Sequence, residues 1–229
     1  MIGQGITIKN IGIVIPAHNE AEHITACLTA INTAIKQLPP TICATVLVVL
    51  DSCEDDTQKL VDCLGAASLA CAFRCVGQVR DLGIRHLIAQ GADWIACSDA
   101  DSQVEPDWLI SQLHHLQQAA ADMICGVVDV DSWQHLSHMT RERYIAHYQD
   151  KMGHRHIHGA NLSFSAKAYL AVGGFDPLPC HEDVKLVEKF ETQGWHIIWS
   201  NQVRVATSSR LDARTQGGFG SFLANLETN

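Results

Sequence analysis

Short runs of β-branched and other apolar residues alternate, along the first half of the chain, with longer segments that have helical spacing. The apolar runs at residues 11–15, 46–50 and 94–97 have the composition of strands buried on both faces. The segment after the first run places apolar side chains on one helical face: Ile24, Leu28, Ile31 and Ile35. This alternation predicts an α/β fold with a mostly parallel sheet, right-handed crossovers and flanking helices.

The alternation changes toward the C-terminus. We expect further strands at 123–128, 159–164, 195–199 and 203–206, and helices around 60–64, at 82–89, from Pro106 onward, at 141–151 and at 183–194. Residues 131–158 form a polar insert rich in His, Arg and Tyr. We expect residues 1–229 to form one domain, with a first half at about 1–128 and a second half at about 129–229.

Polar residues follow three of the predicted strands. They are residues 16–20 after the first strand, Asp51 after the second, and Asp99 and Asp101 after the third. Open parallel sheets bind ligands beyond the carboxyl ends of their strands, so these groups can gather at one rim. Asp99 and Asp101 can converge because alternate residues of an extended segment share a face. Such a carboxylate pair suits Mg²⁺ or Mn²⁺, whose coordination shell substrate phosphates usually complete.

Composition narrows the class of protein. The 229 residues carry a formal net charge of −9, which argues against duplex nucleic acid as a partner because phosphate binding needs clustered Lys and Arg. The nine cysteines are an odd number scattered through apolar segments, which favours free thiols over a disulfide framework. The start of the chain lacks the pattern of a signal peptide, and the longest apolar run, 42–50, is far shorter than the roughly 20 residues of a membrane helix. We therefore expect a cytoplasmic protein with no integral membrane segment, and leave peripheral contact with a membrane open.

An ordered set of motifs resembles the inverting family 2 glycosyltransferases, which have the GT-A fold. In chain order the matching segments are residues 13–20, 48–57, 91–101, 106–109, 159–164, 173–176 and 182–186. The resemblance extends from residue 11 to about residue 210. It implies a Rossmann-like domain with a nucleotide-sugar-binding first half and an acceptor-binding second half.

The resemblance also implies a UDP- or GDP-linked sugar as donor. The implied donor contacts come from Pro16, Ala17, His18, Glu20, Asp51, Arg80, Asp99 and Arg210. The carboxylate of Asp51 suits this role because it accepts well from a uracil N–H or a ribose hydroxyl. Asp101 is the implied main ligand of Mg²⁺ or Mn²⁺, together with Asp99, and the cation offsets the diphosphate charge as the glycosidic bond breaks.

The implied reaction is a hexosyltransferase-like transfer (EC 2.4) by a single displacement that inverts the anomeric carbon. Asp183 is the implied general base that takes the proton of the acceptor hydroxyl, and Glu182 is its neighbour or substitute. A carboxylate pair near a helix start also suits helix capping, so that interpretation stays open.

The chain departs from the family pattern at two places. Asp81 stands where many relatives have Asn, and residues 205–210 lack the His that some members supply as a third metal ligand. The insert contains four closely spaced histidines, which suit either a polar acceptor-site loop or a metal cluster: His147, His154, His156 and His158. Its aromatic residues suit either stacking on a sugar or packing: Trp133, Tyr144 and Tyr148.

Two other functions remain compatible with the same fold. One is a non-catalytic nucleotide-binding protein, against which the intact carboxylate pairs argue. The other is a sugar-nucleotide pyrophosphorylase, which would need a Gly-rich, basic loop, whereas residues 16–30 contain no Gly, Lys or Arg. A dinucleotide oxidoreductase is disfavoured because no Gly-x-Gly-x-x-Gly follows the first strand.

Overall fold

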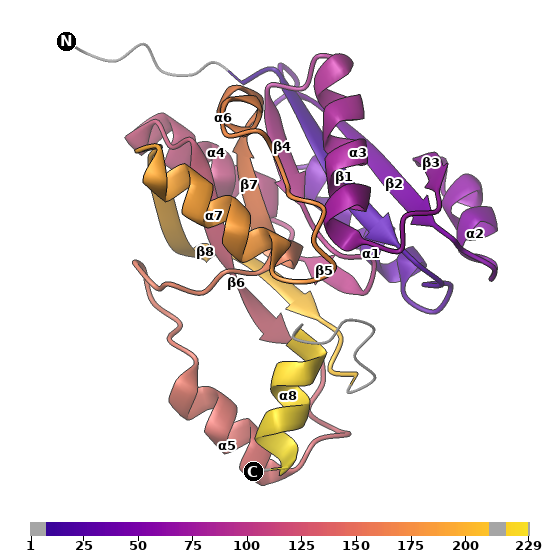
Figure 1. Cartoon of the computed structure of the whole chain (residues 1–229), viewed down its shortest axis with the longest axis vertical. Helices are drawn as coiled ribbons and strands as arrows, with labels where there is room; N and C mark the ends of the chain where they lie inside the picture. Colours follow the sequence, from indigo (N-terminus) through magenta and orange to yellow (C-terminus); the bar gives the residue numbers. More distant parts are fainter. Residues whose placement is uncertain (1–7, 211–218, 229) are drawn as a thin grey trace.

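The computed structural model describes residues 8–210 and 219–228, which form an eight-stranded sheet with helices on both faces. The strands follow the spatial order β3-β2-β1-β4-β7-β6-β8-β5 (Figure 1). In chain order they are β1 (Asn10–Ala17), β2 (Cys43–Asp51), β3 (Ala67–Cys71), β4 (Trp94–Cys97), β5 (Ser102–Val104), β6 (Met123–Val130), β7 (Leu162–Ser165) and β8 (Ile197–Thr207). The helices are α1 (Ile24–Ile35), α2 (Thr57–Cys63), α3 (Val76–Ala89), α4 (Trp108–Ala119), α5 (His138–His147), α6 (Ala166–Ala171), α7 (Glu182–Thr192) and α8 (Phe219–Thr228).

Strands β3, β2, β1 and β4 are parallel, which confirms the arrangement predicted from the apolar runs. β1 lies between β2 and β4, and the register pairs Ile13 with Val46 on one side and Ala96 on the other. The carboxyl ends of these strands therefore share one edge of the sheet. Beyond β4 the directions mix: β7 runs antiparallel to β4 and β6, β8 is parallel to β6, and β5 is antiparallel to β8.

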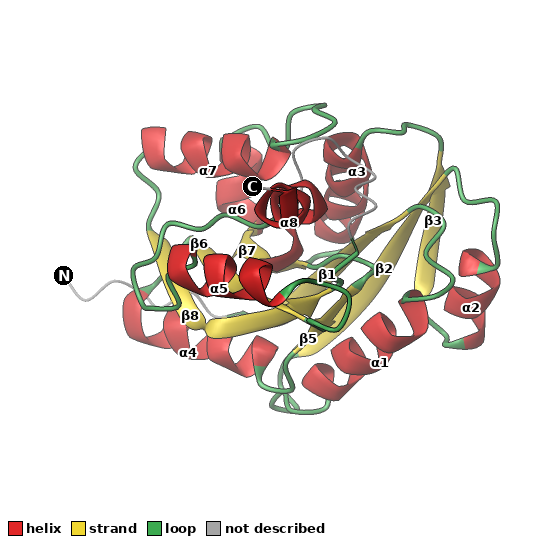
Figure 2. Ribbon diagram, turned by 90° about the horizontal axis from the view of Figure 1, so that it is seen from below, coloured by secondary structure: helices red, strands yellow, loops and turns green. Residues whose placement is uncertain are grey.

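Two layers of helices bury the sheet. Helices α1, α2 and α4 cover one face, and α3, α6 and α7 cover the other (Figure 2). Alternate residues of β1 point to opposite layers, since Ile13 and Ile15 pack with the first layer and Val14 with the second. Burial on both faces explains why these strands are continuous apolar runs.

Helices α5 and α8 form a small unit beside the sheet. Figure 1 shows both projecting away from the sheet at one end of the molecule. Their shared apolar cluster is separate from the two layers and is centred on Leu136, Tyr144 and Leu223. The hydroxyl of Ser137 caps α5 by accepting from the backbone N–H of Thr140 at 3.2 Å. The polar insert is therefore folded against the C-terminal helix.

Several predicted boundaries differ from the structure. The sequence pattern does not predict β3, because the segment at 67–71 contains no β-branched residue. The strands expected at 195–199 and 203–206 are one strand, β8, whose pairing with β6 shifts register between Gly126 and Val127. The helix expected at 141–151 is α5, which begins and ends earlier. None of the helices within 8–210 and 219–228 is long and apolar enough to cross a membrane.

Candidate active site

The predicted site residues lie at the edge where β1, β2 and β4 end. Strand pairing places Ala17 opposite Leu50, the residue before Asp51, and Cys97 opposite Val14. The start of α7 and the end of β8 join this rim through ion pairs. Six of the predicted residues belong to two such networks: Glu20, Arg80, Asp99, Asp101, Glu182 and Arg210.

Arg80 of α3 is the centre of the first network. It is 2% exposed, and its Nη2 donates to Asp99 Oδ1 at 2.5 Å while its Nε donates to Glu182 Oε1 at 3.3 Å. Burial alone lowers the pKa of the guanidinium, but the charges of Asp99 and Glu182 outweigh it and raise the pKa above its usual value. Its Nη1 is buried without a hydrogen-bond partner in the described part of the chain. Arg80 therefore lies beneath the rim and links Asp99, after β4, to Glu182, at the start of α7.

Glu182 and Asp183 occupy the first turn of α7, where the helix dipole favours negative charge. Glu182 is 5% exposed, and burial raises the pKa of its carboxyl, against the opposing charge of Arg80. Asp183 is more exposed than Glu182. Its Oδ2 accepts from the backbone N–H of Gly159 at 2.7 Å, and its Oδ1 accepts from that of Val184 at 2.8 Å. Two backbone donors thus fix the orientation of the Asp183 carboxylate.

Arg210 is the centre of the second network. It follows β8, and its Nη1 and Nη2 donate to the two carboxylate oxygens of Glu20 at 3.1 and 2.8 Å. The same Nη2 lies 2.7 Å from Asp101 Oδ2. One guanidinium therefore bridges Glu20, in the loop after β1, and Asp101, after β4.

Asp51 lies at the β2 end of the rim. It is 6% exposed, and its Oδ1 accepts from the backbone N–H of Phe73 at 2.8 Å. The ring of His18 lies against the same residue, because its Nδ1 is 2.6 Å from the Asp51 carbonyl oxygen. Pro16 and Ala17 close β1 immediately before His18. The predicted nucleotide contacts at β1 and β2 are therefore neighbours.

Asp101 and Asp99 are the residues that could hold a divalent cation. Burial and the charge of Asp99 raise the pKa of Asp101 to about 6, and Arg210 acts in the opposite direction. No group of three or more His, Cys, Asp or Glu within the described residues has the arrangement of a metal site. The carboxylate oxygens fit Mg²⁺ or Mn²⁺ by their chemistry, provided that ligands from outside the protein complete the shell.

Three histidines of the insert, His154, His156 and His158, are packed in a stack of rings. His156 stacks on Tyr148 with ring centroids 4.1 Å apart, and the Tyr144 ring stacks at 4.9 Å from Tyr148. His158 Nε2 lies 3.1 Å from the Tyr148 hydroxyl, and burial lowers the pKa of His158 to about 3. These contacts favour packing over a metal cluster or an open platform for a sugar.

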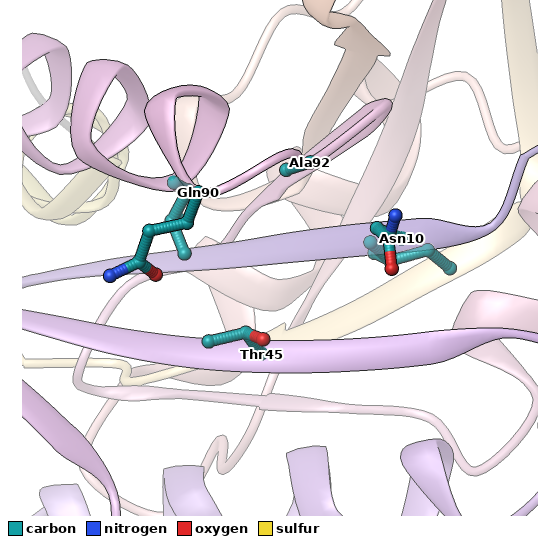
Figure 3. Close-up of a pocket in the computed structure, with 6 residues that line it drawn as sticks. Asn10, Thr45, Gln90 and Ala92 are labelled. Atoms are coloured by element: carbon teal, nitrogen blue, oxygen red, sulfur yellow. The ribbon is translucent and has the colours of Figure 1, made fainter.

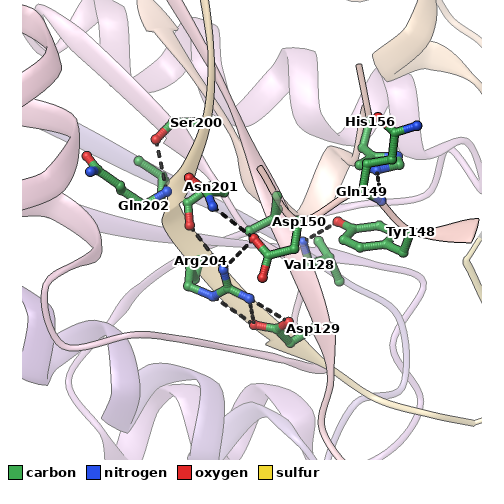
Figure 4. Close-up of polar contacts among 12 residues, drawn as sticks. Val128, Asp129, Tyr148, Gln149, Asp150, His156, Ser200, Asn201, Gln202 and Arg204 are labelled. Atoms are coloured by element: carbon green, nitrogen blue, oxygen red, sulfur yellow. Dashed lines mark hydrogen bonds and ion pairs between the residues drawn. The ribbon is translucent and has the colours of Figure 1, made fainter. Parts of the chain in front are cut away.

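An ion-pair network fastens this insert to the sheet (Figure 4). Arg204 of β8 donates to both oxygens of Asp129 and, at 2.9 Å, to Asp150 Oδ1. The hydroxyl of Tyr148 accepts from the backbone N–H of Val128 at 2.8 Å. The end of the insert is therefore tied to β6 and β8.

Two cavities lie at opposite ends of the sheet. A cavity of about 540 Å³ borders the rim, and Arg210, His23, Asp55, Asp131 and His135 are among its lining residues. A second cavity of about 50 Å³ lies at the amino ends of β1 and β2, beside Asn10, Thr45 and Gln90 (Figure 3). Of these two cavities, the one that borders the rim has room for a ligand larger than a few water molecules, and the smaller one does not.

Gly159 belongs to the site, although none of the sequence motifs gives it a role of its own. A Cβ on this residue would lie 2.8 Å from Arg80 Nη2, so a side chain cannot be added without moving the arginine. The available signal was a glycine at the entrance to an apolar, strand-like motif, which often marks a close backbone approach.

The chain is similar to known proteins in sequence and in fold. The model of glycosyl transferase family 2 matches residues 12–170. A glucosyl-dolichyl phosphate glucuronosyltransferase from Haloferax volcanii is 24% identical in an alignment of 183 residues that covers 70% of this chain and 58% of that protein. The chain therefore spans little more than half the length of this relative.

Solved structures show the same fold. The mannosyltransferase PcManGT from Pyrobaculum calidifontis, in complex with GDP-Man and Mn²⁺, superposes with a TM-score of 0.67 at 17% identity, covering 88% of this chain and 57% of that one. TarS from S. aureus (residues 1–349), in complex with UDP-GlcNAc, gives 0.66 at 14% identity, covering 93% and 60%. The α/β sheet described above has the GT-A fold.

Proposed function

The chain belongs to glycosyl transferase family 2, and from this premise we propose that it transfers a sugar from a nucleotide-diphosphate donor to an acceptor hydroxyl with inversion of the anomeric carbon. The observation that carries the proposal is the pair of contacts made by Arg80. Its buried guanidinium joins Asp99, on the donor side of the rim, to Glu182, the neighbour of Asp183. A single side chain thus couples the donor and acceptor sides of the site.

The donor side is formed by the ends of β1, β2 and β4. Asp51 and the 16–20 loop would contact the base and ribose of the nucleotide, and Arg210 would contact the diphosphate. Support comes from the donors found in two proteins of the same fold, GDP-Man and UDP-GlcNAc. Asp101 and Asp99 would hold a divalent cation, which supplies charge stabilisation to the departing diphosphate.

The acceptor side is organised by Asp183. Its carboxylate takes the proton of the acceptor hydroxyl while the hydroxyl oxygen forms a bond to the anomeric carbon. The bond from that carbon to the diphosphate oxygen breaks, and the nucleoside diphosphate leaves on the opposite face. Two backbone donors hold the Asp183 carboxylate in one orientation, which suits a base that acts at a fixed distance.

Glu182 is better suited to positioning than to proton transfer. Its carboxylate is buried and engaged with Arg80, whereas Asp183 is the more accessible of the two. We therefore assign the base to Asp183 and the orientation of Arg80 to Glu182.

The first test is thermal stabilisation by UDP, GDP and their sugar conjugates, each with and without Mn²⁺. Binding at 100 times Kd stabilises the folded state by about 2.7 kcal/mol, which raises Tm by several degrees in a chain of this size. We expect stabilisation by one nucleotide class that requires Mn²⁺, and slow hydrolysis of the matching nucleotide-sugar to sugar and nucleoside diphosphate. Absence of stabilisation by all of them would contradict the proposal, and stabilisation without any turnover would favour the non-catalytic alternative.

A further inference from the structure

Arg210 forms an ion pair with Asp101, the carboxylate that the proposed cation needs as a ligand. Its Nη2 is 2.7 Å from Asp101 Oδ2 and 2.8 Å from Glu20 Oε1. The two carboxylates are largely buried, with 15% and 7% of their side chains exposed. Two like charges in such surroundings need a positive partner, and Arg210 supplies it here.

The backbone that carries Arg210 is fixed on both sides of the rim. The N–H of Ser208 donates to the carbonyl oxygen of Asp101 at 3.1 Å, and the N–H of Ser209 donates to Asp131 Oδ1 at 2.9 Å. The hydroxyls of Thr207 and Ser102 are 2.8 Å apart. The guanidinium can therefore change partners through rotation of its own side chain, without movement of β8.

Space for such a rotation exists beside the guanidinium. Arg210 lines the cavity of about 540 Å³ and its side chain is 27% exposed, more than either carboxylate that it contacts. A diphosphate entering the rim offers an arginine a bidentate partner of higher charge than a single carboxylate. The diphosphate is therefore the stronger partner for the guanidinium, and the cavity leaves space for the side chain to rotate away from Asp101 when the donor binds.

We infer that Arg210 and a divalent cation compete for Asp101, and that donor binding resolves the competition by drawing the guanidinium to the diphosphate. This inference rests on the proposed function, and it adds a coupling between nucleotide and cation. Without donor, Arg210 holds Glu20 and Asp101 and keeps the cation affinity low. With donor, Asp101 is free, so each ligand strengthens the binding of the other.

The coupling predicts opposite effects of one substitution on two ligands. We expect Arg210→Ala to bind Mn²⁺ alone at least about fivefold more tightly than the wild type, because the guanidinium no longer competes for Asp101. The same variant should bind UDP or GDP in saturating Mn²⁺ more weakly, because a diphosphate contact is lost. The factor by which nucleotide tightens Mn²⁺ binding should therefore shrink.

The experiment titrates Mn²⁺ into the full chain, followed by electron paramagnetic resonance of the free ion, without nucleotide and with saturating UDP or GDP. Arg210→Gln provides a second neutral variant of similar length. Arg155→Ala is the matched control for the loss of one positive charge, because its ion pair with Glu191 lies outside the site. We expect the control to behave as the wild type in both titrations.

The outcomes separate this inference from the proposed function. Tighter Mn²⁺ binding together with weaker nucleotide binding, in both neutral variants, supports the competition. Unchanged or weaker binding of Mn²⁺ alone by these variants overturns it, even when the wild type still binds nucleotide with Mn²⁺. If the wild type binds neither UDP nor GDP with Mn²⁺, the proposed function fails and the inference fails with it.

Discussion

The backbone N–H of Gly159 donates a 2.7 Å hydrogen bond to Asp183 Oδ2, and so a residue 24 positions earlier in the chain orients the proposed base. The same glycine lies against Arg80, since a Cβ added to it would meet Nη2 at 2.8 Å. Gly159 therefore contacts both the proposed base, Asp183, and Arg80, which links Glu182 to Asp99. These contacts require that residue 159 has no side chain.

Gly159→Ala should disturb this contact without removing any polar group. The added methyl group displaces the Arg80 guanidinium, and we expect the free energy of unfolding to fall by about 1–3 kcal/mol and the turnover number to fall with it. Urea denaturation and initial-rate kinetics measure the two effects. In an Arg80→Met background the methyl group meets no guanidinium, so the penalty should be smaller. An equal penalty in both backgrounds would show that the clash with Arg80 is not the cause.

Asp183→Asn should remove proton transfer while leaving the fold in place. The amide oxygen can still accept from the Gly159 N–H, but the side chain can no longer take a proton. We expect kcat to fall by about 10²–10⁴-fold, with donor affinity within about twofold of the wild type. Glu188→Gln is the matched control, because it changes an exposed carboxylate of the same helix. Full activity of Asp183→Asn would move the base to another residue.

Glu182→Gln should act mainly on stability. The amide keeps an acceptor for Arg80 but leaves part of a buried positive charge uncompensated, and we expect a loss of about 1–3 kcal/mol in the free energy of unfolding. Turnover, measured where the variant is folded, should fall less than in Asp183→Asn. Loss of transfer at unchanged stability would instead make Glu182 the base.

The sheet edge could be predicted from sequence because it depends on local patterns. The apolar runs predict the positions of β1, β2 and β4. The polar residues that follow these runs predict which carboxylates meet at the edge of the sheet. The family resemblance, confirmed by the match over residues 12–170, indicated the class of reaction. It did not predict that Arg80 is buried between two carboxylates. An arginine in a helix has the same sequence signal whether it faces a ligand or two buried carboxylates.

The insert was harder to predict for a different reason. Its aromatic and histidine residues are spaced as a binding loop could be, and only their packing against α8, a helix about 70 residues later, shows that they form a small core. The network of Arg204 with Asp129 and Asp150 likewise joins residues far apart in sequence. Contacts of this kind depend on tertiary structure and leave no local periodicity.

The ring stack of the insert makes stability depend on pH. Burial lowers the pKa of His158 to about 3, whereas the unfolded value is about 6.5, so between these values the unfolded chain binds more protons. The contribution of His158 to stability is therefore complete above pH 6.5 and is lost as the pH falls toward 3. Burial lowers the pKa of His154 and of His156 as well, and both act in the same direction.

His158→Gln should weaken this dependence. We expect the free energy of unfolding of the wild type to fall between pH 7.5 and 5.5 more steeply than that of the variant, by up to about 1.4 kcal/mol per pH unit below 6.5. Urea denaturation at pH 7.5, 6.5 and 5.5 measures it. Asp101, whose raised pKa acts in the opposite direction, is present in both proteins and cancels in the difference. The control His138→Gln removes a histidine whose side chain is 84% exposed, and it should keep the wild-type slope. Equal slopes in His158→Gln and the wild type would contradict a His158 that partial burial keeps neutral.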